Sequence, residues 1–172
     1  RANADRGAVV VIVRDARAGD APDIAGIWNP VIAGSAATFT DRPKAEAEIA
    51  AMIESRCAAG FGFLVAEATG QVRGFVTWAQ FRAGPGYAGC LEHTIMVQAG
   101  AQGQGVGRVL MGALQDRARA QRNRMLIGAI SGANPAGLGF HAALGFAQVG
   151  RIPAAGVKSG AAHDLILMQK FL

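Results

Sequence analysis

One short segment near the middle of the chain constrains the fold more than any other. Four glycines, at positions 100, 103, 105 and 107, separate an apolar run that ends at Gln98 from a helical pattern that starts at Val106. Glycine adopts left-handed backbone conformations at little cost, so a strand can turn directly into a helix here. The main-chain N–H groups of such a turn and the N-terminus of the helix together attract an anion. The segment predicts a strand–loop–helix unit that binds a phosphate group.

Two common phosphate-binding loops do not fit this segment. A Rossmann fingerprint requires a third glycine where the chain has Arg108, and a Walker loop requires a Gly-Lys-Ser/Thr sequence that the chain lacks. The glycines therefore bind an anion by another scheme, or they form a plain strand–helix turn.

The remaining patterns predict a single α/β (α+β) domain in the order β-α-α-β-β-β-α-β-α-β-β, with a mostly antiparallel sheet and one parallel crossover. The predicted strands cover residues 9–13, 61–68, 72–81, 90–98, 125–130, 146–150 and 163–171. The predicted helices cover residues 20–28, 44–59, a segment starting at 106, and 134–144. The first strand is a continuous β-branched run, which is typical of a strand buried on both faces. Residues 1–7 are interpreted as a tag remnant or trimmed leader, and residues 8–172 as the domain.

Composition excludes several classes of protein. The chain has 172 residues and no uncharged apolar run of about 18, so a membrane span is not expected. Its 17 Lys and Arg exceed its 12 Asp and Glu, but they are scattered, which favours a small polyanion over nucleic acid as partner. Cys57 and Cys90 are too few for a disulfide framework, and they do not have the spacing of metal ligands. We therefore expect no metal, and we expect a cytoplasmic location.

The glycine segment, read as Gln102-Gly103-Gln104-Gly105-Val106-Gly107, resembles the pyrophosphate loop of the GNAT family of N-acetyltransferases. Residues 91–97 (LEHTIMV) and 134–146 resemble the strand and the cofactor-side helix of its phosphinothricin and methionine sulfoximine N-acetyltransferase branch. Shorter matches at 27–29, 37–39, 156–158 and 163–165 extend the resemblance over nearly the whole chain.

This resemblance implies a GNAT fold of about seven strands and four helices, acetyl-CoA as co-substrate, a small-molecule amine as acceptor, and a homodimer. Main-chain groups at Ile95, Met96 and Val97 are expected to hold the pantetheine arm. The residues expected at the pyrophosphate are Gln102, Gly103, Gln104, Gly105, Val106, Gly107 and Arg108. Asn134 is expected to contact the cofactor as well.

The resemblance also points to Glu92 and His141 as catalytic residues. An alkyl ammonium group has a pKa of roughly 9 to 10.5, so a base must remove a proton before the nitrogen can attack. Side chains alternate along a strand, so Glu92 and His93 cannot both enter one site without a bulge. We therefore assign the site to the face of Glu92. The alternatives are that Glu92 forms a surface ion pair, that His141 is a packing residue, and that Cys90 carries the acetyl group in a ping-pong route.

Candidate acceptor-binding residues are Phe39, Arg82, Tyr87, Glu92, Thr94 and Lys158. Gly84, Met96 and Ala162 stand where members of this branch carry larger or basic side chains, which predicts a larger and less cationic acceptor pocket. Two other functions remain open: acetylation of protein or peptide N-termini, and CoA binding without catalysis.

Overall fold

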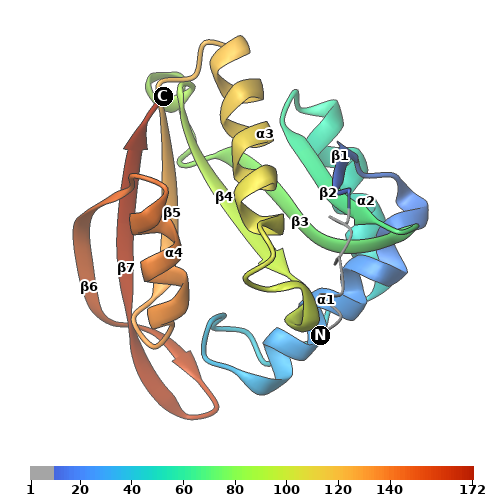
Figure 1. Cartoon of the computed structure of the whole chain (residues 1–172). Helices are drawn as coiled ribbons and strands as arrows, with labels where there is room; N and C mark the ends of the chain where they lie inside the picture. Colours follow the sequence, from blue (N-terminus) through green and yellow to red (C-terminus); the bar gives the residue numbers. More distant parts are fainter. Residues whose placement is uncertain (1–9) are drawn as a thin grey trace, which may run out of the picture.

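The computed structural model describes residues 10–172, which contain seven strands and four α-helices in the predicted order (Figure 1). The helices are α1 (Ala21–Gly34), α2 (Glu46–Ala58), α3 (Val106–Ala120) and α4 (Pro135–Ala143). The strands are β1 (Ile12–Asp15), β2 (Gly62–Ala68), β3 (Gln71–Gln80), β4 (Cys90–Val97), β5 (Met125–Ser131), β6 (Ala147–Lys158) and β7 (Ala161–Phe171). The interpretation of residues 1–7 as a tag or leader lies outside the described residues.

All seven strands form one sheet in the order β1-β2-β3-β4-β5-β7-β6. Neighbours are antiparallel except β4 and β5, which are parallel. This confirms the predicted mixed, mostly antiparallel sheet with one parallel pair.

The parallel pair opens into a gap. Strands β4 and β5 pair only at Cys90–Met125, Leu91–Leu126 and Glu92–Ile127. Beyond these residues the strands diverge, as Figure 1 shows: they meet at one end and separate toward the other. The gap is the feature of the fold that positions the site.

Helices cover both faces of the sheet and define two cores. On one face, α3 packs its buried Leu110 and Leu114 against a cluster that includes Leu91. On the other face, α1 and α2 bury Ile32 and Ile49 against a cluster that Met96 joins. Odd-numbered side chains of β4 therefore face α3 and even-numbered side chains face α1 and α2, as strand alternation requires.

Helix α1 is longer than predicted and ends at Gly34 rather than at Trp28. The polar residue Asn29 and the following Pro30 suggested an end, yet Ile32 is fully buried and continues the apolar face of the helix. Proline has no N–H, so Pro30 leaves the carbonyl of Gly26 without its usual helical donor. Both residues lie at the cavity described below.

The two edge strands also differ from the predictions. Strand β1 pairs only with β2, and Ile12 is 59% exposed, so the predicted burial of this strand on both faces is wrong. Strand β6 runs to Lys158 rather than stopping at Gly150, with two register shifts against β7. Because most of its side chains are exposed, no alternation of apolar and polar residues marked its length.

Candidate active site

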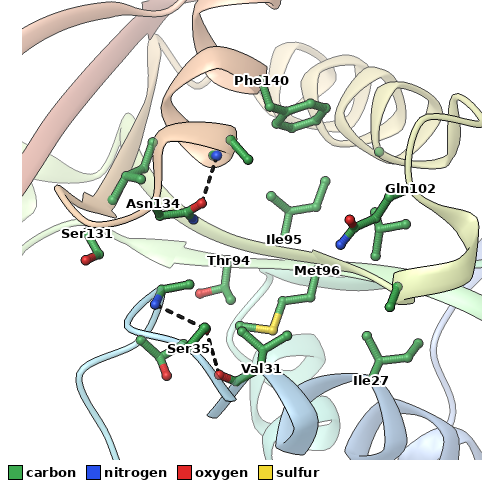
Figure 2. A pocket seen from close by; sticks show the side chains of 18 of the residues that line it. Ile27, Val31, Ser35, Thr94, Ile95, Met96, Gln102, Ser131, Asn134 and Phe140 are labelled. Atoms are coloured by element: carbon green, nitrogen blue, oxygen red, sulfur yellow. Dashed lines mark hydrogen bonds between the residues drawn. The ribbon is translucent and has the colours of Figure 1, made fainter. Parts of the chain in front are cut away.

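A cavity of about 1050 Å³ occupies the gap between β4 and β5. Its walls come from α1 and the segment after it, the second half of β4, the glycine segment, the start of α3, the end of β5, and α4 (Figure 2). Figure 2 shows Ile95 on the side of α4, and Thr94 and Met96 on the side of Val31 and Ser35. The cavity therefore reaches both faces of the sheet.

The main chain of β4 offers polar groups to this gap at alternate residues. The N–H of Gln98 donates to Arg73 of β3, and the N–H of Phe81 in turn donates to the carbonyl of Cys90. The pairing of β3 and β4 has no register shift between these two hydrogen bonds. The main-chain N–H and C=O groups of the even-numbered residues of β4 therefore bond to β3. Ile95 and Val97 thus direct their N–H and C=O groups into the gap. Met96 directs its own groups toward β3 and reaches the cavity with its side chain.

The glycine segment forms the turn that the sequence predicts. Gly103 and Gly105 have φ angles of 74° and 84°, in the left-handed region that other residues disfavour. The first helical hydrogen bond runs from Val109 to Gly105, so the N–H groups of Val106, Gly107 and Arg108 have no helical acceptor. This helix terminus lines the cavity and favours negative charge.

The residues of this segment have different tasks. Gln102, Gly103, Gly105, Gly107 and Arg108 line the cavity. The side chain of Gln104 instead closes the turn with a 2.8 Å bond to the carbonyl of Gly100, and Val106 is buried in the α3 core. A Cβ on Gly107 would lie 3.0 Å from the ring of Phe140, so this glycine also lets α3 approach α4.

Asn134 caps α4, as predicted, with its Oδ1 accepting from the N–H of Gly137 at 2.9 Å. Its amide also lines the cavity, which leaves Nδ2 as the group for a ligand. A cavity lined by strand amides and by an anion-attracting helix terminus fits acetyl-CoA, whose arm contains two amide groups and whose far part carries phosphates.

Two buried histidines contact each other in the cavity wall. Nε2 of His93 lies 2.9 Å from Nε2 of His141, and Nδ1 of His141 donates to the carbonyl of Gly137 at 2.7 Å. Burial lowers the pKa of His93 to about 3, helped by the neighbouring His141 and opposed by the carbonyl of Ile127. Burial likewise lowers the pKa of His141, against the effect of Gly137. Both imidazoles are neutral at neutral pH.

Glu92 lies on the opposite face of β4, toward α2. Burial raises the pKa of its carboxyl group, and the positive charge of Arg56 in α2 opposes this shift. Glu92 does not line the cavity, but Thr94, the next side chain on the same face, does. The main-chain positions of Glu92 and Thr94 are about 7 Å apart along the strand.

The structure therefore does not bring Glu92 and His141 together, although the sequence assigned both to one site. His141 pairs with His93, which strand alternation had excluded. As alternation predicts for a strand without a bulge, Glu92 and His93 do not both line the cavity. The choice of the Glu92 face assumed a site on one face of the sheet, whereas the cavity passes through the gap and receives side chains from both faces.

Among the candidate acceptor residues, Phe39 and Thr94 line the cavity. The ring of Phe39 stacks on His163 with centroids 6.3 Å apart, next to Gly156, where a Cβ would overlap the ring at 2.0 Å. Sequence reasoning missed several other lining residues: Ile27, Val31, Ser35, Thr38 and Ser131. A longer α1 would have revealed Val31 and Ser35, but Asn29 and Pro30 obscured it.

Besides Glu92, three candidates lie away from the cavity. The guanidinium of Arg82 stacks 5.9 Å from the ring of Tyr87, and both side chains are exposed. Lys158 is buried, and its Nζ bonds to the carbonyl of Ile32 at 2.5 Å, to the carbonyl of Thr40, and to Asp41 at 3.0 Å. Lys158 thus ties the end of α1 to the following segment instead of pointing at an acceptor.

Cys90 does not support a ping-pong route. It is buried, it does not line the cavity, and burial raises the pKa of its thiol, so the nucleophilic thiolate is disfavoured. Within residues 10–172, no helix is long and apolar enough to cross a membrane, and no cluster of three or more potential metal ligands is found.

Comparisons with known proteins agree with this architecture. The acetyltransferase (GNAT) family model matches residues 28–146. An L-methionine sulfoximine/L-methionine sulfone acetyltransferase of Pseudomonas paraeruginosa is 35% identical over 91% of this chain and 92% of its own. The fold and the site define an acetyltransferase that uses acetyl-CoA. The chain belongs to the GNAT family.

Two solved structures extend the comparison. A phosphinothricin acetyltransferase from Sinorhizobium meliloti, in complex with acetyl-CoA, is 32% identical with a TM-score of 0.88, over 94% of this chain and 88% of its own. A ribosomal-protein-alanine N-acetyltransferase from Brucella melitensis is 32% identical with a TM-score of 0.90, over 94% of this chain and 99% of its own.

Proposed function

We propose that this protein acetylates the primary amine of a small amino-acid-like molecule. The observation that carries the proposal is the cavity that passes through the sheet, with anion-binding main-chain groups on the side of α3 and a second compartment beneath α1. The curated relative from P. paraeruginosa, named for methionine sulfoximine and methionine sulfone, supports an acceptor of this size.

The reaction must move two protons. Acetyl-CoA supplies an acetyl group activated as a thioester. The acceptor ammonium loses one proton, its nitrogen bonds to the acetyl carbon, the carbon–sulfur bond breaks, and the nitrogen loses its second proton. One proton goes to the CoA sulfur and the other to solvent. Bases are therefore needed on the acceptor side, where the nitrogen is deprotonated.

Glu92 is the proposed base for the first proton. Its raised pKa brings the carboxylate closer to the basicity that proton transfer near neutral pH requires. It acts through a water molecule beside Thr94, because the carboxylate itself stands outside the cavity wall. The N–H groups of Ile95 and Val97 are the proposed partners of the pantetheine arm, and those at the start of α3 are the proposed partners of the pyrophosphate.

The lining of the cavity supports a weakly cationic acceptor compartment. Within the described residues, Arg108 is the only Lys or Arg that lines the cavity, and it lies at the phosphate end. The acceptor is therefore held mainly by apolar and hydroxyl side chains, among them Val31, Thr38 and Phe39. We infer a compartment that accepts amino acids with uncharged side chains.

Release of free CoA thiol tests the proposal. Methionine sulfone, methionine sulfoximine, phosphinothricin and unmodified methionine serve as acceptors, with acetyl-CoA alone as the blank. We expect turnover above the blank with at least the sulfone or the sulfoximine. No turnover with any of these amines would overturn the proposal.

Acetylation of a peptide N-terminus is the second candidate function, favoured by the similarity to the B. melitensis structure. Peptides with N-terminal alanine distinguish the two. Mass spectrometry that finds acetylated peptide but no acetylated free amino acid would replace the first candidate by the second.

We further propose a cytoplasmic homodimer. Both cysteines are free thiols, which suits a reducing compartment. The β6–β7 end of the sheet exposes Val149, Ile152, Val157 and Phe171, each at least 48% exposed, and an apolar edge of this kind suits burial against a second copy. Sedimentation of the purified protein tests the dimer, and a monomer at micromolar concentration would contradict it.

A further inference from the structure

Strand β5 also directs main-chain groups into the gap, from the side opposite β4. At one end of the β5–β7 ladder the N–H of Leu172 donates to the carbonyl of Arg124, and at the other end the N–H of Gly132 donates to the carbonyl of Asp164. The ladder has no register shift between these bonds, so the even-numbered residues of β5 bond to β7. The odd-numbered residues therefore direct their N–H and C=O groups toward β4.

Ala129 keeps both of these groups for a ligand. Pairing with β4 ends at Glu92–Ile127, so Ala129, two residues further along β5, has no partner there. Ser131, the next residue of the row, already accepts with its carbonyl from the N–H of Asn134. Ala129 is half-buried and lines the cavity. Because main-chain polar groups require a hydrogen-bond partner, its N–H and C=O are left to water or to a ligand.

The side chains of this row face the compartment beneath α1. A Cβ on Gly128 would lie 3.2–3.5 Å from the rings of His93 and His141, so the even-numbered side chains of β5 face α4. The odd-numbered side chains point to the opposite face, where Ala129 contributes only a methyl group. Leu165, the partner of β5 position 131 on β7, is on that face too and lines the cavity. The face beside Ala129 therefore has space for the side chain of an acceptor.

An α-amino acid carries the two groups that complement such a main-chain pair. Its ammonium donates hydrogen bonds and its carboxylate accepts them, as the N–H and C=O of a neighbouring strand residue do. We propose that the main chain of Ala129 binds the acceptor: the C=O accepts from the ammonium, and the N–H donates to the carboxylate. This inference rests on the proposed acetyl transfer and defines its acceptors as α-amino acids with a free carboxylate.

The acceptor then occupies the position of an antiparallel strand residue opposite Ala129. Opposed residues of an antiparallel pair point their side chains to one face, so an L-amino acid directs its side chain toward α1 and Phe39. A D-amino acid in this position directs it toward His93 and His141, whose rings fill that space. The register of β4 and β5 puts the amine across the gap from Ile95, a proposed partner of the pantetheine arm. Main chain thus binds the constant part of the acceptor, and side chains contact its variable part.

A replacement within the main chain tests the site. An Ala129→lactic acid replacement exchanges the N–H for an ester oxygen and keeps the methyl side chain, and the N–H groups that bond to β7 belong to other residues. The same replacement at Ala133 is the matched control, because its N–H bonds to Ser131 at 3.2 Å and it does not line the cavity. Each ester also weakens the carbonyl of the preceding residue, so this effect is common to both. Melting temperature shows that each protein has folded.

The measured quantity is discrimination between L-methionine sulfone and 3-(methylsulfonyl)propylamine, which lacks only the carboxylate. In the wild type we expect kcat/KM to be about 10- to 100-fold higher for the amino acid, the effect of one hydrogen bond to a charged group. Lactic acid at position 129 should bring this ratio close to one, and lactic acid at position 133 should leave it unchanged. The KM for acetyl-CoA should stay constant in both. A wild-type ratio in the position 129 protein would overturn the proposal.

The enantiomers test the orientation of the acceptor. D-methionine sulfone should have a kcat/KM at least about tenfold lower than the L form, because its side chain meets a filled space. Equal values for the two enantiomers would contradict the antiparallel arrangement.

Nitrogen-15 NMR tests the contact without turnover. Protein labelled with ¹⁵N-alanine is saturated with CoA and titrated with L-methionine sulfone. We expect the amide proton of Ala129 to move downfield as a carboxylate becomes its acceptor, and the signal is identified by its absence in Ala129→Gly. A signal that stays in place at millimolar ligand would overturn the proposal. If the wild type acetylates none of the amines tested above, the proposed function fails, while this titration still decides whether β5 binds an amino acid.

Discussion

The two ends of the cavity are built in different ways. The phosphate end is made of main-chain groups and glycines within one continuous segment, residues 95–108, together with the cap of α4. The acceptor end is made of side chains from α1, the segment after it, and β4. Gly156 leaves space for the ring of Phe39, and Lys158 bonds to the carbonyl of Ile32, each across more than a hundred residues of sequence. A site for a constant ligand can be local and made of backbone, whereas a site for a variable ligand draws on distant side chains.

The largest effect is expected at the proposed base. Glu92→Gln should lower kcat by about 10²- to 10⁴-fold with little change in the KM for acetyl-CoA, because it removes proton transfer without touching the phosphate end. Glu54→Gln, which neutralises an exposed carboxylate of α2, is the matched control. Steady-state thiol release measures both.

The same residue should set the acid side of the pH profile. Because burial raises the pKa of Glu92, and a base acts only when deprotonated, kcat should fall as the pH drops through a value above that of an ordinary glutamate. This limb should disappear in Glu92→Gln. An unchanged limb in that variant would assign it to another group.

A smaller effect is expected when the acceptor end is reshaped. A Cβ at position 156 would lie 2.0 Å from the ring of Phe39, so Gly156→Val must displace that ring. We expect the KM for the acceptor to rise about 10- to 100-fold, equivalent to the 1–3 kcal/mol of an overpacked site, while the KM for acetyl-CoA stays constant. Gly112→Ala, in open space on α3, controls for added volume. Equal changes in both KM values would show that the two ends are not independent.

A substitution at the phosphate end should affect acetyl-CoA binding and not the acceptor. Arg108→Gln should raise the KM for acetyl-CoA about tenfold, since one charge-assisted contact contributes roughly 1.5 kcal/mol, and leave the KM for the acceptor unchanged. Arg119→Gln, at the far end of α3, removes the same charge away from the cavity. Similar kinetics for the two variants would argue against a local role of Arg108.

The smallest catalytic effect is expected at Lys158. Lys158→Met leaves the carbonyls of Ile32 and Thr40 without their donor, which should lower the free energy of unfolding by about 1–3 kcal/mol. The acceptor KM should rise only a few-fold, since the segment after α1 loosens without losing a direct contact. Urea denaturation and thiol release measure the two effects. A loss of activity without a loss of stability would show instead that Lys158 binds the acceptor directly.

The local parts of this architecture were predictable from the sequence. Gly103 and Gly105 predicted the turn, because few other residues adopt positive φ. Asn134 predicted the start of α4, because its side chain caps a helix. The alternation along β4 sorted its side chains correctly onto two faces. Edge strands were predicted less well, because β6 carries no buried face that would impose a pattern.

The combination of those parts was not predictable. Alternation put Glu92 and His93 on opposite faces, and nothing local in the sequence says that β4 and β5 separate after Glu92 and open both faces to one cavity. Nor does spacing reveal that His141 meets His93, 48 positions earlier, or that Lys158 reaches back to Ile32.

The sequence by itself determined the order of elements, the glycine turn and the helix terminus for a phosphate, because each depends on conformational preferences of neighbouring residues. It also indicated the family, through the resemblance of its motifs to those of known members. Only the tertiary structure decided which side chains share the cavity. That depends on where two parallel strands part, and hydrogen bonding between distant segments, not local preference, fixes that point.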